Sequence, residues 1–142
     1  MYVIFLRRGS DNDKLIAKYE LTQDKLLAGI EKHITMLASM DSRQAYPLNV
    51  GATTLLRLQW YQAAEKVFRS ALDRDDEYHE AWTSLGRVLA RQGLSNIAVG
   101  KPGIKQLEEA RKCFMRALVI SPNNPEANYN YDRVENDLEY LR

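Results

Sequence analysis

A pattern of small and large residues that recurs along this 142-residue chain limits its fold more than any other feature. One stretch carries Trp82, Leu85, Gly86 and Leu89, and a later one carries Ala110, Phe114 and Ala117, with Pro122 behind them. The alanine–phenylalanine–alanine spacing also occurs earlier, at Ala64, Phe68 and Ala71. Small residues at helical spacing let two antiparallel helices approach closely, and the large ones fill the space around them. Because one such pair cannot bury its own apolar face, the pattern predicts stacked helix pairs.

The spacing of apolar residues predicts helices throughout and no sheet, because no stretch alternates with a period of two. The first helical region covers 11–39, and we expect a break near Thr22. Further helices are predicted at 48–58, 61–73, 80–92, 104–120 and 125–141. We expect Gly93 to cap the helix before it, because glycine is favoured just past a helix end. The stretch 94–103, with Gly100, Pro102 and Gly103, is then predicted to be a mobile or partner-bound loop.

The repeats divide the chain into five parts. The parts are an apolar N-terminal segment at 1–10, an N-terminal helical cap at 11–44, a degenerate repeat at 45–78, a repeat at 79–124 with an insertion loop at 94–103, and a C-terminal capping helix at 125–142. In the degenerate repeat, Leu48 stands where the later repeat has Trp82, and Asp76 stands in place of Pro122. About 12 extra residues separate the two helices of the later repeat.

These residues resemble the signature of the tetratricopeptide repeat family, which has Trp, Leu and Gly on the first helix of a pair and Ala, Phe, Ala and Pro on the second. The resemblance covers about residues 45–140. It implies an all-α fold, a short α–α superhelix (a solenoid) of about two helix-pair repeats with flanking N- and C-terminal helices. In this family the first helices line a hollow face that receives a peptide or a partner helix, although the fold alone does not decide the ligand.

The family frame places a group of polar residues on the hollow face. Its members that we expect to bind a partner are Arg57, Thr83, Arg87, Arg91, Tyr129, Asn130 and Arg133. Arginine binds carboxylates with a two-pronged geometry, so this set predicts an acidic partner. The alternative is that these arginines are solvated or paired within the chain, since Glu80 and Glu126 lie nearby in the sequence.

One subgroup of the family holds the carboxyl-terminal tails of heat-shock chaperones with a Lys, Asn, Asn, Lys and Arg clamp. The matching positions here are Asn49, Thr53, Ser84, Glu126 and Asn130. The clamp residues are therefore missing, and Glu126 would repel a carboxylate. The resemblance argues against a chaperone-tail receptor of that kind.

Other chemistry has little support in the sequence. The net charge of +1 gives no sign of nucleic-acid binding. His33, His79 and Cys113 stand alone and far apart, so we expect neither a metal site nor a cofactor. Cys113 falls in mid-helix beside Phe114, which suits a packed side chain better than a nucleophile. We therefore expect a protein that is not an enzyme. A single cysteine also suits a reducing, intracellular compartment.

The apolar run from Met1 to Leu6, followed by Arg7 and Arg8, leaves three alternatives open. It is too short to cross a membrane, which takes about 20 apolar residues, and its charges follow the apolar run instead of preceding it as in a secretory signal. It could be a packed terminal segment, the remnant of a membrane anchor, or a strand added to another chain. The leading hypothesis is a protein-interaction scaffold or accessory subunit of a larger assembly. The alternative is a membrane-tethered receptor or assembly factor, of the organelle-import or cytochrome-biogenesis type, associated with the membrane through Met1–Arg8.

Overall fold

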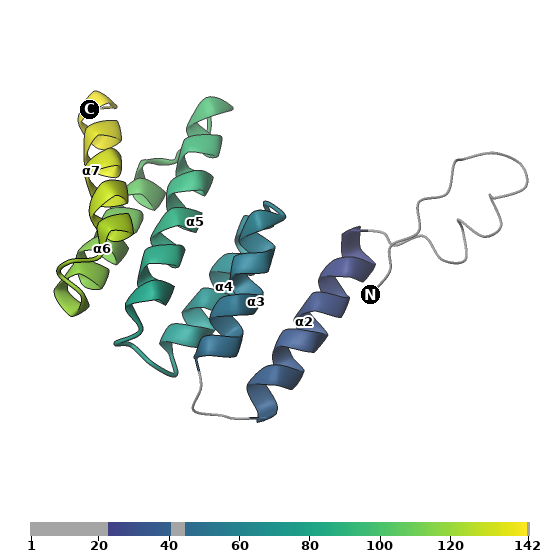
Figure 1. Ribbon diagram of the computed structural model, residues 1–142. Helices are drawn as coiled ribbons and strands as arrows, with labels where there is room; N and C mark the ends of the chain where they lie inside the picture. Colours follow the sequence, from purple (N-terminus) through teal and green to yellow (C-terminus); the bar gives the residue numbers. More distant parts are fainter. Residues whose placement is uncertain (1–22, 41–44, 142) are drawn as a thin grey trace, which may run out of the picture. The chain divides into compact units, whose positions relative to one another are not determined.

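The computed structural model describes residues 23–40 and 45–141, and these ranges contain helices and no strand. In chain order the helices are α2 (Gln23–Met40), α3 (Tyr46–Arg57), α4 (Tyr61–Leu72), α5 (His79–Ala98), α6 (Ile104–Ile120) and α7 (Pro125–Tyr140), as Figure 1 shows. The all-α prediction is confirmed. The Met1–Arg8 segment and the break expected near Thr22 lie outside the described residues. Within the described ranges, no helix combines the length and the apolar character that crossing a membrane requires.

The contacts divide the chain into two units, Met1–His33 and Ile34–Arg142, and the boundary falls within α2. In the first unit the described residues, 23–33, are helical. The second unit contains α3 to α7 and all of the site discussed below.

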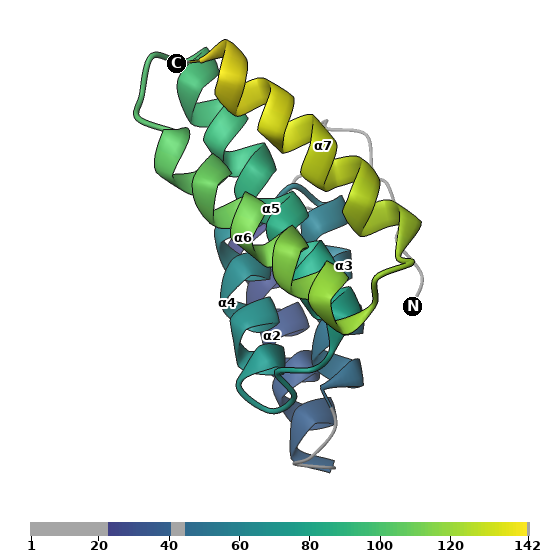
Figure 2. The same cartoon turned by 90° about the vertical axis from the view of Figure 1, so that its left-hand side faces the viewer.

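Within the second unit the helices stack as two pairs and a single closing helix. α3 packs on α4 and α5 packs on α6, while α4 also contacts α5, and α6 also contacts α7. The first helices of successive pairs touch as well, α3 with α5 and α5 with α7. Figures 1 and 2 accordingly show α3, α5 and α7 as a row, with α4 and α6 packed beside it.

The repeated small and large residues form the core of this stack. Their side chains have no solvent-exposed area at Ala64, Phe68, Ala71, Ala110, Phe114 and Ala117. The pattern of small residues also predicts that Gly86 and Ala110 face each other at a close helix crossing, and the side chain nearest to Gly86 is that of Phe114, one turn after Ala110. A Cβ atom built on Gly86 would lie only 2.6 Å from Cε1 of Phe114. The glycine therefore makes room for the buried ring of Phe114.

The prediction that Gly93 ends the first helix of the later repeat is wrong. α5 runs through Gly93 to Ala98, so residues 94–98 of the expected insertion loop are helical and only 99–103 connect α5 to α6. A Cβ atom on Gly93 would lie 2.8 Å from the carbonyl oxygen of Gly103, so this glycine permits a close contact between the start of α6 and α5. The extra residues of this repeat lengthen its helices: α5 has 20 residues and α6 has 17, whereas α3 and α4 have 12 each.

The glycine that ends α5 is Gly100, which has a positive φ of 73°. Its N–H donates to the carbonyl oxygen of Ile97, and the N–H of Lys101 donates to that of Asn96, which together make a Schellman motif. α3 ends in the same motif, but there the residue with positive φ is Gln59, at 62°. A side chain in this conformation is strained, because its Cβ lies close to the following carbonyl oxygen.

Candidate partner-binding groove

A groove of about 50 Å³ lies between α5 and α7. Its lining residues are Arg87, Ala90, Arg91 and Leu94 from α5, and Asn130, Arg133, Val134 and Asp137 from α7. Each set follows the pattern i, i+3, i+4 and i+7, which places its residues on one face of their helix. Two facing helices thus build the groove without any loop residue.

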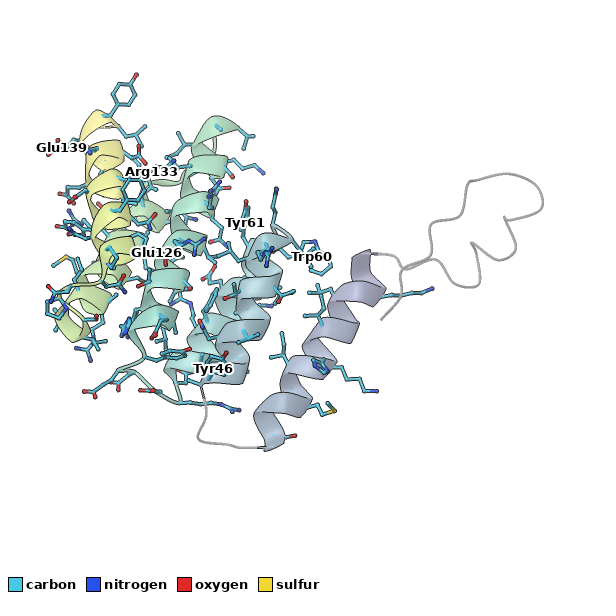
Figure 3. All side chains as sticks on the ribbon, in the orientation of Figure 1. Tyr46, Trp60, Tyr61, Glu126, Arg133 and Glu139 are labelled. Atoms are coloured by element: carbon cyan, nitrogen blue, oxygen red, sulfur yellow. The ribbon has the colours of Figure 1, made fainter. Side chains whose placement is uncertain are left out.

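The groove combines apolar side chains with basic ones. Val134 is buried, Ala90 and Leu94 are half-buried, and Arg91 and Arg133 are exposed. Figure 3 labels Arg133 on α7. Such a surface offers apolar contact at its base and two-pronged hydrogen-bond donors to any group that enters.

The three groove arginines differ in how they are paired. Nη1 of Arg87 lies 2.8 Å from Oε1 of Glu126. By contrast, the side chains of Arg91 and Arg133 form no hydrogen bond or ion pair with any residue that the structure describes. Asp137 contributes one carboxylate to the lining. Two guanidinium groups therefore remain available to an acidic ligand.

Hydrogen bonds at the start of α7 fix this helix against α5. Asn124 is its N-cap, and its Oδ1 accepts hydrogen bonds from the backbone N–H groups of Glu126 and Ala127, at 3.1 and 3.0 Å. Its Nδ2 lies 3.2 Å from Nδ1 of His79 on α5. One asparagine thus caps α7 and joins it to the helix that carries the other half of the groove.

Further along, an ion pair holds α7 to α6. Nη1 of Arg111 lies 3.3 Å from Oε2 of Glu135. Ala127 and Leu138, near the two ends of α7, are buried. The α7 wall of the groove is therefore held along its length by packing as well as by polar contacts.

Four of the seven predicted partner-binding residues line the groove: Arg87, Arg91, Asn130 and Arg133. Arg57, in the last turn of α3, and Tyr129 are exposed but are not among its lining residues. Thr83 is buried, at 2% exposed, and is also not among the lining residues. Its Oγ1 donates to the carbonyl oxygen of His79 at 2.9 Å, beneath the start of α7, so no partner can reach it.

Four lining residues are absent from the predicted set: Ala90, Leu94, Val134 and Asp137. Leu94 was assigned to a loop, although it is three residues after Arg91 and lies on the same face once α5 continues past Gly93. Asp137 is four residues after Arg133 and seven after Asn130, so helical spacing could have identified it. Its negative charge lowers the net charge of the groove.

The lone cysteine offers no reactive group. Cys113 is buried, and burial raises the pKa of its thiol to about 12, so the thiol keeps its proton at neutral pH. In the described part of the chain, no three His, Cys, Asp or Glu side chains gather where they could hold a metal ion.

No family model matches the sequence. A curated relative is human tetratricopeptide repeat protein 7A, with 38% identity over 71 residues. The match covers 50% of this chain but only 7% of the relative.

Solved structures extend the likeness over most of the chain. The second TPR domain of human RPAP3, in complex with the HSP70 peptide SGPTIEEVD, superimposes with a TM-score of 0.61 at 22% identity, covering 88% of this chain and 90% of that one. The chain has a tetratricopeptide-like (TPR-like) repeat fold.

Two further TPR structures resemble this TPR-like protein to the same degree. The first TPR of Spaghetti (RPAP3), bound to the HSP90 peptide SRMEEVD, gives a TM-score of 0.60 at 22% identity, covering 91% of this chain and 86% of that one. The TPR domain of Arabidopsis OM64 gives 0.59 at 21% identity, covering 87% and 88%. At these identities the likeness concerns the fold.

Proposed function

We propose that this TPR-like protein is an interaction scaffold or accessory subunit that binds an acidic segment of a partner protein in the groove between α5 and α7. It acts by binding, without catalysis or a cofactor. The observation that carries the proposal is the pair of unpaired guanidinium groups, Arg91 and Arg133, beside the apolar Ala90, Leu94 and Val134.

The size of the groove indicates which part of the ligand enters it. The groove is open to solvent, and a volume of about 50 Å³ between its walls suits the end of one side chain. We therefore expect one acidic side chain or a terminal carboxylate to enter it, while neighbouring residues of the segment lie over α5 and α7. Ion pairs at exposed guanidinium groups contribute only about 0–1 kcal/mol each, so we expect the two arginines to act together with the apolar contact beneath them.

The peptides bound by the solved neighbours support an acidic ligand, whereas the residues of this chain argue against a chaperone tail. The peptides in the two RPAP3 complexes, SGPTIEEVD and SRMEEVD, both carry acidic residues. In this chain, however, the positions of the chaperone-tail clamp are occupied differently. Nδ2 of Asn49 donates to the hydroxyl group of Tyr78, and Glu126 pairs with Arg87. We therefore propose an acidic segment other than a chaperone tail.

The proposal can be tested with a fluorescent peptide of alternating Glu and Leu residues and a counterpart in which Gln replaces Glu. Fluorescence anisotropy should show that only the acidic peptide binds, and that binding weakens as salt rises, because charges are screened beyond about 8–10 Å at physiological ionic strength. The double variant Arg91→Gln, Arg133→Gln should raise the Kd at least tenfold, which corresponds to a loss of about 1.4 kcal/mol.

The matched control is the double variant Lys66→Gln, Lys112→Gln, which removes two positive charges from exposed positions on α4 and α6. It should change the Kd less than twofold. Equal binding of the Gln peptide, or an unchanged Kd in the double arginine variant, would overturn the proposed function.

A further inference from the structure

One of the three groove arginines is already engaged by an acid of the same chain. Oε1 of Glu126 lies 2.8 Å from Nη1 of Arg87, within the range of a charge-assisted hydrogen bond. The side chains are 55% and 42% exposed, respectively, so water and a ligand can reach the pair. Exposed pairs of this kind stabilise a fold only slightly, which makes a structural role a weak explanation for Glu126.

The carboxylate of Glu126 is also not needed to begin α7. The cap is made by Asn124, whose Oδ1 accepts from the backbone N–H groups of Glu126 and Ala127. The carbonyl oxygen of Glu126 accepts from Nδ2 of Asn130 at 2.7 Å, again through the backbone. The side chain of Glu126 can therefore leave Arg87 without releasing the start of the helix.

We propose that Glu126 is an internal competitor for the ligand's carboxylate and sets the specificity of the groove; this rests on the function proposed above. While Glu126 holds Arg87, an incoming acid meets Arg91 and Arg133. To engage all three arginines, it must displace Glu126. The three arginines carry three positive charges, and Glu126 and Asp137 carry two negative ones, so the groove and its adjoining Glu126 have a net charge of +1. This balance suits a ligand that brings one carboxylate at a time and works against densely acidic segments.

The test compares two neutralising variants of α7. Glu126→Gln should lower the Kd of the acidic Glu/Leu peptide about three- to tenfold. Glu139→Gln removes the same charge from an exposed position near the other end of α7, labelled with Glu126 in Figure 3. It lies 13 residues further on, or about 20 Å along the helix, beyond the screening length at physiological salt. It should change the Kd less than twofold.

A double-variant cycle ties the effect to Arg87. In an Arg87→Gln background, adding Glu126→Gln should leave the Kd unchanged, because the guanidinium group that Glu126 holds is no longer present. If Glu126→Gln strengthens binding equally with and without Arg87, the charge of Glu126 acts on the ligand at a distance, and the proposal that Glu126 competes for Arg87 is refuted. An unchanged Kd in Glu126→Gln alone also refutes the role of Glu126 as a competitor. The double variant Arg91→Gln, Arg133→Gln tests the proposed function separately. Thermal unfolding of each variant confirms that the fold is retained.

Discussion

The packing of Gly86 against Phe114 permits a quantitative test of the repeat core. In Gly86→Ala the new Cβ would lie 2.6, 2.8 and 2.9 Å from three carbons of the ring, whereas carbon atoms pack best at about 3.5–4.0 Å. Phe114 is fully buried, so its ring has no free side towards which to move. Overpacking of this kind costs about 1–3 kcal/mol, and three short contacts place this case near 3 kcal/mol. Alanine regains about 1 kcal/mol in helix propensity, which leaves a net loss of about 2 kcal/mol.

Phe114→Leu is the second variant of the cycle, because it removes the ring that the new methyl group would meet. In that background Gly86→Ala should keep only its helix-propensity gain and raise the free energy of unfolding by about 1 kcal/mol. Urea denaturation of the four proteins, the wild type, each single variant and the double variant, measures the coupling. We expect about 3 kcal/mol, at the upper end of values for residues in contact. Additive effects, within about 0.5 kcal/mol, would refute the contact and the reasoning built on it.

Three further predictions concern single positions. Gln59→Gly should stabilise the fold by about 0.5–1 kcal/mol in urea denaturation, because it relieves the positive φ at the end of α3, whereas Gln59→Ala should not. Asn124→Ala should cost about 1 kcal/mol or more, measured in the same way, since it removes the cap of α7. The raised pKa of Cys113, about 12 against an ordinary 9.0, means that the folded state keeps this proton longer than the unfolded state. The free energy of unfolding should therefore fall as pH rises from 9 towards 12, and Cys113→Ala should flatten that slope; an identical slope would contradict it.

The buried residues of the second helix in each pair could be predicted from the sequence, because their spacing within that one helix places them on the same face. Ala110, Phe114 and Ala117 share a face through helical spacing alone, and the structure buries all three. The end of α5 could not be predicted in this way. Glycine serves both at helix ends and at close contacts, and only the packing of Gly93 against Gly103 distinguishes the two uses.

For the groove, too, features within one helix could be predicted and contacts between helices could not. The spacing of Arg87 and Arg91 placed both side chains on one face, and the groove contains both. The pairing of Arg87 with Glu126 and the burial of Thr83 depend on how α7 is positioned along α5, which no spacing within one helix reveals. Contacts between helices therefore had to come from the structure.

The most direct test of the groove is an NMR titration of the ¹⁵N-labelled protein with the acidic Glu/Leu peptide and with its Gln counterpart. The account predicts saturable shift changes for amide groups along the facing sides of α5 and α7, centred on Arg91, Leu94 and Val134, with the acidic peptide alone. Changes concentrated on the outer face of α4 and α6, or equal changes with the Gln peptide, would contradict the claim that this groove binds an acidic partner.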